Sequence, residues 1–134
     1  MSLTKPFADY PHSRQTGHLL FMAGQGCRDP QTNLCCGLKR DADEKVVGYD
    51  IREQTEGVLK NVERVLQSSG LSRSDLVDVT VFLTDMNDFQ SMNEVWNAFF
   101  EGLKSPTRTT VAVKQLPGEN FIEMKAIAEL GAKA

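Results

Sequence analysis

Two amphipathic helices separated by one strand restrict the folds that this 134-residue chain can adopt. Asp50 followed by Glu53 resembles a capping box, and Gly70 supplies a stop, so the sequence predicts a first helix of about five turns. The apolar face of this helix carries Ile51, Thr55, Val58, Leu59, Val62, Val65 and Leu66 at helical spacing. Asn87 with Gln90 predicts the cap of a second helix. The apolar stripe of this second helix is typical of a hydrophobic core rather than a ligand site. It comprises Phe89, Met92, Val95, Trp96, Phe99, Phe100 and Leu103.

Alternating patterns predict the strands around these helices. Residues 76–84 alternate apolar and polar side chains between the two helices. Residues 18–23 predict a largely buried strand that ends at Gly24. Residues 27–49 contain glycines, a proline and a run of charges, which fits a loop or an irregular hairpin. Two further strands are predicted near the end of the chain.

The resulting order is two or three strands, helix, strand, helix, strand, strand. Each helix is long enough to cross over between parallel strands, and both must cover one face of a mixed sheet. The other face stays bare unless a second subunit or a ligand covers it, and domains of this kind usually oligomerise. We therefore expect an α+β fold in a single domain spanning residues 1–134.

The charge balance argues against polyanionic partners. The chain has 15 basic and 18 acidic residues, a net charge of −3, and no dense block of lysine and arginine. We therefore expect neither a nucleic acid nor a membrane as partner. The N-terminus lacks the pattern of a signal peptide, and no apolar run is long enough for a membrane span, so a soluble, cytoplasmic protein is expected.

Three cysteines, Cys27, Cys35 and Cys36, are odd in number, and two of them are adjacent. Only His12 and His18 could join them in a metal site, and no standard zinc spacing is present. Reduced thiols are therefore the preferred interpretation, ahead of a disulfide or a metal site.

The stretches 105–117 and 121–130 predict two neighbouring strands, of which Arg108 opens the first and Glu123 lies near the start of the second. Glu123 projects away from the apolar face formed by alternate residues of its strand. A guanidinium grips a carboxylate with two hydrogen bonds, and a carboxylate can orient or deprotonate water. The pair suggests hydrolytic chemistry on a small acid, although a cross-strand ion pair on a solvated face is the commoner explanation of such a pattern.

The chain resembles the Rid (YjgF/YER057c/UK114) family of small deaminases that act on enamines and imines, over nearly its whole length. The resemblance is carried by Ala23-Gly-Gln25, Gln54-Thr55, Asn61-Val62, Asp78-Val-Thr-Val-Phe-Leu-Thr-Asp85, Asn87-Asp-Phe89, Asn93, Phe99-Phe100, Pro106-Thr-Arg108, Leu116-Pro117, Ile122-Glu123 and Ala126-Ile-Ala128.

Within the family, the chain looks most like the 2-aminomuconate deaminases. This likeness rests on residues 50–55, 106–117 and 122–126. His12 stands where many members carry a tyrosine, and Lys125 where many carry a second glutamate. The loop around residues 37–49 is also longer than in short members.

The resemblance implies a chorismate-mutase-like trimer with sites between subunits and no metal or organic cofactor. Arg108 would clamp a substrate carboxylate, and Glu123 would position the attacking water. Gly24 would allow close backbone approach to the ligand, with a tight turn as its alternative role. Asn93 would line the cleft, unless it is simply solvated.

A dicarboxylate substrate needs a second positive or donor group for its distal end. Arg28 is the first choice, with His12 and Arg14 behind it. His12 could instead act as a proton donor, because its ordinary pKa is near 6.5.

Three other functions remain open at this stage. One is a broad deaminase of 2-iminobutanoate and 2-iminopropanoate. Another is a non-catalytic, metabolite-binding regulatory trimer that uses the same clefts. Nuclease or RNA-binding activity fits poorly with the acidic balance.

Overall fold

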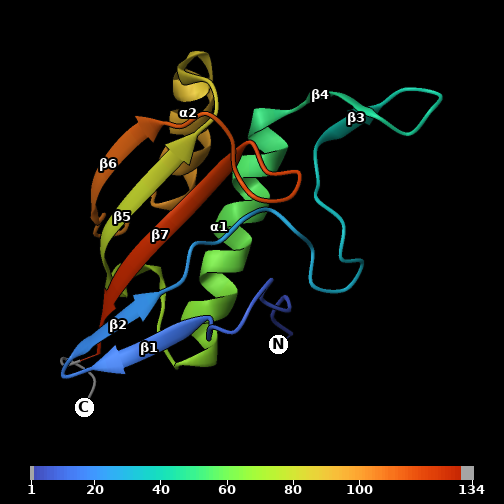
Figure 1. Ribbon diagram of the computed structural model, residues 1–134. Helices are drawn as coiled ribbons and strands as arrows, with labels where there is room; N and C mark the ends of the chain where they lie inside the picture. Colours follow the sequence, from blue (N-terminus) through green and yellow to red (C-terminus); the bar gives the residue numbers. More distant parts are fainter. Residues whose placement is uncertain (1, 131–134) are drawn as a thin grey trace.

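Strand β7 (Ile122–Glu129) is the middle strand of a five-stranded sheet with the order β1-β2-β7-β5-β6 (Figure 1). The computed structural model describes residues 2–130; Met1 and residues 131–134, which the sequence analysis included in the domain, lie outside the described residues. The other strands are β1 (Ser13–Thr16), β2 (Leu19–Met22), β5 (Leu76–Leu83) and β6 (Thr107–Ala112). β5 and β6 run parallel, and the remaining pairs are antiparallel, so the predicted mixed sheet is confirmed.

Two helices, α1 (Ile51–Ser68) and α2 (Phe89–Phe99), lie against one face of this sheet (Figure 1). α2 forms the crossover between the parallel strands β5 and β6. This arrangement confirms the α+β fold with both helices on one face. No helix within residues 2–130 is long and apolar enough to cross a membrane.

The core lies between the sheet and the helices, and the strand alternation determines which side chains enter it. β7 sends every second residue inward, and β5 does the same over its second half. The buried side chains of the two strands are Leu76, Val79, Val81, Leu83, Ile122, Met124, Ala126 and Ala128. They pack against Val58, Leu59, Val62, Val65 and Leu66 of α1, the apolar stripe expected from the sequence.

Helix α1 begins where the sequence predicted. The Asp50 carboxylate accepts hydrogen bonds from the backbone N–H groups of Arg52, at 2.9 Å, and Glu53, at 3.2 Å. Further along, the buried Gln54 side chain donates to the carbonyls of Cys36 and Glu119, each at 3.1 Å, and accepts from the N–H of Phe121 at 2.8 Å. These bonds tie α1 to two loops that are distant in the sequence.

The predicted cap of the second helix is wrong. The side chain of Asp85, rather than Asn87, accepts the capping hydrogen bond, and it caps a single 3-10 turn over Met86–Asp88. α2 then begins at Phe89, and its N-cap residue, Asp88, makes no side-chain capping bond. The Asn87–Gln90 pattern matched the spacing of a cap, but this short turn occupies the position where the helix was expected to start.

The N-terminal part contains more strand than was predicted. β1 precedes β2, and the two form a hairpin around Gly17, whose φ of +56° suits glycine. The β2 strand was expected to be largely buried, but Leu19 and Phe21 are both 37% exposed and only Leu20 and Met22 are buried. Its outer face is therefore uncovered.

Residues 27–49 contain a short irregular hairpin, as the sequence suggested. It is formed by β3 (Leu38–Arg40) and β4 (Val46–Tyr49), whose pairing shifts register between Lys39 and Arg40. The strand that Arg108 was expected to open is β6, which begins one residue earlier and spans Thr107–Ala112.

The sheet face opposite the helices carries apolar side chains that no residue between 2 and 130 covers. Leu19 and Phe21 of β2 and Val111 of β6 are each more than a third exposed. Antiparallel sheets tolerate one solvated face, but such a face normally carries polar residues. The mixed character of this face is consistent with burial against another molecule.

The Asp50 cap can be tested by substitution. Asp50→Ala should lower the free energy of unfolding by about 1 kcal/mol, because two N–H groups at the start of α1 lose their acceptor. Urea unfolding at fixed protein concentration measures the change. Asp43→Ala, at an exposed position in the β3–β4 hairpin, is the control and should stay within about 0.5 kcal/mol of wild type.

Candidate active site

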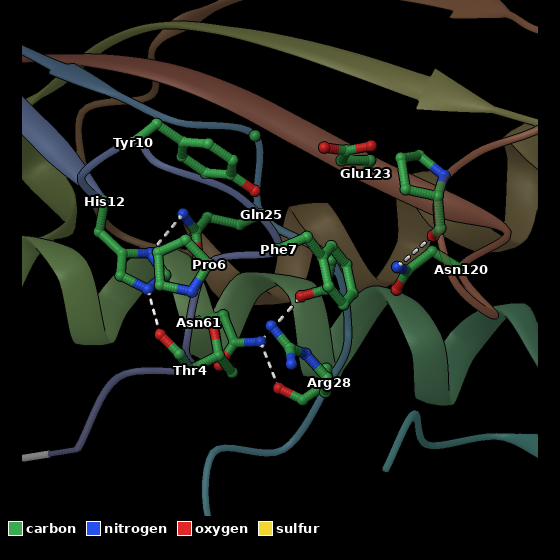
Figure 2. A pocket seen from close by; sticks show the side chains of 13 residues that line it. Thr4, Pro6, Phe7, Tyr10, His12, Gln25, Arg28, Asn61, Asn120 and Glu123 are labelled. Atoms are coloured by element: carbon green, nitrogen blue, oxygen red, sulfur yellow. Dashed lines mark hydrogen bonds between the residues drawn. The ribbon is translucent and has the colours of Figure 1, made fainter. Parts of the chain in front are cut away.

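A small cavity of about 70 Å³ lies beside the start of β7, and four of the predicted site residues line it (Figure 2). These residues are His12, Gly24, Arg28 and Glu123. The cavity is large enough for a few water molecules but much smaller than the roughly 300 Å³ typical of a small-molecule pocket. A single chain therefore offers a place for water next to Glu123, but not for a whole six-carbon substrate.

Gly24 and Glu123 are in close contact. A Cβ atom on residue 24 would overlap Oε1 of Glu123, so any larger residue would displace the carboxylate. Gly24 was expected to let the backbone approach a ligand closely, and the group that it approaches in the structure is Glu123. Its φ is not positive, so the alternative role in a tight turn is not supported. Burial raises the pKa of the Glu123 carboxyl above its usual value. A half-buried carboxylate with a raised pKa is suited to accepting and returning a proton.

His12 belongs to a hydrogen-bonded chain in the cavity wall. The amide nitrogen of Gln25 lies 3.3 Å from Nδ1 of His12, and Nε2 of His12 is hydrogen-bonded to the carbonyl of Thr4 (Figure 2). An amide nitrogen only donates, so Nδ1 is the acceptor and Nε2 carries the proton. The Nε2 proton of His12 therefore points at the N-terminal segment.

Arg28 lies in the same cavity but is occupied by contacts within the chain. Its guanidinium donates to the side chain of Asn33 at 2.8 Å and to the carbonyl of Lys5. The ring of Phe7 lies 4.3 Å from Cζ of Arg28, within the range of a cation–π interaction. Arg14, the remaining candidate, is an exposed residue of β1 paired with Phe21 and does not line this cavity.

Arg108 and Asn93 lie elsewhere, beside helix α2. The parallel register pairs Arg108 with Val79, a residue buried under the helices, so Arg108 points to the helix side of the sheet. Its Cζ lies 4.9 Å from the centre of the Trp96 ring, and its Nη1 lies 3.7 Å from Sδ of Met92. Burial lowers the pKa of Arg108, and no acidic side chain within residues 2–130 forms an ion pair with it.

The prediction that Arg108 and Glu123 lie on neighbouring strands is wrong. β5 lies between β6 and β7. Glu123 pairs with Phe82, which faces away from the helices, so the two charged side chains are on opposite faces of the sheet. The physical reason is that β7 buries an apolar row and takes a central position, whereas the threonine-rich β6 is suited to an edge.

Two buried oxygens near Arg108 lack hydrogen-bond partners within residues 2–130. They are Oδ1 of Asn93, next to Met92 in α2, and Oγ1 of Thr110, two residues beyond Arg108 on the same side of β6. Buried polar atoms are nearly always paired, so unpaired oxygens next to the half-buried Arg108 suggest that a ligand or another chain completes them. Thr110 was not predicted from the sequence, although it lies two residues after Arg108 and therefore on the same face of β6.

Asn120 was also missed, and Asn61, although part of the family resemblance, was given no role in the site. Asn120 Oδ1 accepts from the N–H of Cys27 at 2.8 Å, and Asn61 donates to the carbonyls of Gly26 and Arg28 at 2.8 Å. Both asparagines hold residues 26–28 against the cavity. No cluster of three or more histidine, cysteine, aspartate or glutamate side chains suited to a metal ion is present in the described part of the chain.

Comparison with known proteins determines the family. The family model described as Endoribonuclease L-PSP matches residues 2–130. The chain belongs to the Rid (YjgF) family. A RutC family protein of Pyrococcus abyssi is 40% identical over 124 residues, which cover 92% of this chain and 88% of that protein.

Two Escherichia coli relatives connect this Rid protein to solved structures. The first, named "Putative reactive intermediate deaminase TdcF", is 34% identical over 121 residues, covering 89% of this chain and 84% of that protein. A TdcF crystal structure with bound serine matches with a TM-score of 0.82 and 32% identity, over 95% of this chain and 92% of that chain. The second, the YjgF gene product, matches with a TM-score of 0.81 and 29% identity, over 96% and 93%.

The raised pKa of Glu123 predicts a pH-dependent stability. The folded state binds this proton more tightly than the unfolded state, so the stabilisation is complete below the ordinary pKa of 4.5 and is lost as pH rises through the raised value. The free energy of unfolding of wild type should therefore fall, relative to Glu123→Gln, as pH increases from about 4.5 towards neutrality.

Urea unfolding across this pH range measures the difference. Glu129→Gln, at an exposed position on the same face of β7, is the matched control and should follow the wild-type curve. A constant difference between wild type and Glu123→Gln at all pH values would show that burial does not perturb Glu123.

Proposed function

We propose that this Rid protein is a deaminase that hydrolyses enamines or imines of small carboxylic acids. The observation that carries the proposal is the half-buried Glu123 carboxylate beside a water-sized cavity, held against Gly24. The name of the E. coli relative TdcF, a reactive intermediate deaminase, supports the same class of reaction.

The reaction requires a positioned water and a proton relay. Water adds to the imine carbon while Glu123 takes a proton from the water and passes it to the nitrogen, which leaves a neutral carbinolamine. Glu123 then takes the hydroxyl proton and passes it to the amine as the carbon–nitrogen bond breaks, so that a ketone and ammonia result. A carboxyl with a raised pKa suits both steps, because it must accept a proton and then give it back near neutral pH.

The active unit in this proposal is a homotrimer whose sites join two subunits. Glu123, Gly24 and His12 of one subunit would meet Arg108 and Asn93 of its neighbour. Three features support this arrangement: Arg108 and Glu123 lie on opposite faces within one chain, the cavity of one chain is too small for the substrate, and buried oxygens near Arg108 are unpaired. The uncovered apolar side chains of the sheet would supply an interface.

Arg108 would hold the substrate carboxylate. Its guanidinium is partly buried against Trp96 and has no carboxylate partner within residues 2–130, so a ligand carboxylate would complete it. The unpaired oxygens of Asn93 and Thr110 would then accept hydrogen bonds from the substrate amine or from water.

The specific substrate proposed is 2-aminomuconate, which would yield 4-oxalocrotonate and ammonia. This choice rests on the sequence resemblance in residues 50–55, 106–117 and 122–126. The distal carboxylate would meet Arg28 or His12, which lie together in the cavity of Glu123. A broader activity on 2-iminopropanoate and a purely metabolite-binding trimer remain the alternatives.

Ammonia release from freshly generated 2-aminomuconate, compared with 2-aminoacrylate, tests the reaction and the substrate together. Wild type should accelerate release from 2-aminomuconate more, and Glu123→Gln should lower kcat by roughly 10²- to 10⁴-fold while a substrate analogue still binds. Glu129→Gln should keep wild-type kinetics. Release at the spontaneous rate with wild type would refute the deaminase, and a preference for 2-aminoacrylate would refute only the substrate.

Mixed trimers test the shared site. Arg108→Lys and Glu123→Gln should each be nearly inactive, because an ammonium cannot reproduce the two-bond grip of a guanidinium and an amide cannot take the proton. After subunit exchange in a 1:1 mixture, roughly a quarter of the sites should combine an intact Arg108 with an intact Glu123 from different subunits, restoring that share of activity.

Light scattering and native mass spectrometry check that trimers and hybrids form. Each variant exchanged with itself is the control and should stay inactive. Hybrid trimers without recovered activity would place Arg108 and Glu123 in separate functions.

A further inference from the structure

All three cysteines lie close together around residues 26–28, the segment that also borders the cavity of Glu123. Arg28 and Cys35 form an antiparallel bridge, so Cys27 and Cys36 are directly opposite each other in the same pairing. A Cβ atom placed on Gly57 of α1 would lie 2.7 Å from Sγ of Cys36 and 3.1 Å from Cβ of Cys27. The two side chains thus meet over Gly57, where only a glycine leaves them room.

This geometry suits a disulfide between Cys27 and Cys36. Directly opposed residues of an antiparallel pair have Cα atoms about 4.5–5.5 Å apart, and disulfides span about 4.4–6.8 Å. Cys35 is adjacent to Cys36 and pairs with Arg28 rather than with Cys27, and its thiol donates to Oδ1 of Asn120 at 3.7 Å. All three cysteines are free thiols in this structure.

The pair is accessible from solvent. Cys27 and Cys36 line a cleft of about 240 Å³ together with Lys60 and Arg64 of α1. Cys27 itself is only 2% exposed, whereas Cys36 is half-buried. A small oxidant can therefore reach Cys36 first, with Cys27 behind it.

The pKa values of both half-buried thiols, Cys35 and Cys36, are lowered, so it is the position of Cys36 opposite Cys27 that identifies Cys36 as the attacking sulfur. Hydrogen bonding from Cys27 lowers the pKa of Cys36, although burial opposes this and the Glu53 carbonyl, 3.2 Å away, accepts the proton of the neutral thiol. Hydrogen bonds to Cys35 and Cys36, together with burial, raise the pKa of Cys27, which stays protonated. Cys35 also receives a hydrogen bond from Cys27, and its pKa is lowered to about 7.

We propose that Cys27 and Cys36 form a reversible redox site, in which Cys36 reacts with a hydroperoxide and then closes a disulfide with Cys27. The Cys36 thiolate attacks the peroxide oxygen, the O–O bond breaks, and water or an alcohol leaves after taking a proton, so that Cys36 becomes a sulfenic acid. The Cys27 sulfur then attacks Cys36, losing its proton, and a second water leaves as the S–S bond forms. A dithiol reductant returns both thiols.

Such a bond would act directly on the wall of the candidate active site. Residues 26–28 would be tied covalently to the segment that leads into β3, and Gly26 and Arg28 both line the cavity of Glu123. The site would thereby sense the redox state of its surroundings.

Peptide mapping of the full-length protein after mild hydrogen peroxide tests the proposal. Trypsin cleaves after Arg28, so Cys27 lies on a different peptide from Cys35 and Cys36, and a disulfide is the link between them. We expect an intrachain link that lowers the mass by about 2 Da per chain, is reversed by dithiothreitol, and leaves Cys35 free for alkylation.

Matched variants distinguish the two candidate partners of Cys27. Cys35→Ser should still form the link, whereas Cys36→Ser should give at most about a tenth of the wild-type amount, because the attacking thiolate is missing. In Cys27→Ala, Cys36 should be trapped as a sulfenic acid by dimedone.

Fragmentation of the linked wild-type peptides assigns the bond without any variant, so the test does not depend on the variants folding. A Cys27–Cys35 bond, a bond between two chains, or three thiols that survive peroxide would each overturn the proposal.

Discussion

The antiparallel pairing of β5 with β7 is the contact on which the rest of this structure depends. It places Val79, Val81 and Leu83 beside Ala126, Met124 and Ile122, and this apolar surface is what α1 and α2 cover. Strand β7 also pairs with Gln25, whose backbone N–H and carbonyl both form hydrogen bonds with Met124. The segment that forms the cavity wall is therefore attached to the centre of the core, which keeps Gly24 pressed against Glu123.

That pairing also explains why a single chain cannot assemble Arg108 with Glu123. Each strand alternates its side chains between the two faces, so once β7 buries Ile122 and Met124, Glu123 must face away from the helices. The parallel register of β6 sends Arg108 to the opposite side. A register change that brought both charges to one face would expose the core, so the remaining way to combine them is association between chains.

Elements governed by local patterns could be predicted from the sequence, whereas those governed by tertiary pairing could not. The α1 helix and its Asp50 cap follow from neighbouring residues, as does the outward direction of Glu123. The insertion of β5 between β6 and β7 depends on which strand buries more apolar surface, and no local signal states it. The start of α2 was misplaced for a related reason, because Asp85 closes a short turn first. Asn61 and Asn120 act only through loops distant in sequence.

The N-terminal segment has a consequence for how any ligand enters. Nε2 of His12 and Nη2 of Arg28 are hydrogen-bonded to the backbone carbonyls of Thr4 and Lys5. These carbonyl oxygens take the positions that the carboxylate of an acidic ligand would need. A ligand that binds to either donor must displace a backbone carbonyl of the same chain. The apparent affinity of the ligand is its intrinsic affinity multiplied by the fraction of molecules in which the carbonyl is displaced. The first residues of the chain thus weaken the binding of any ligand that uses these two donors.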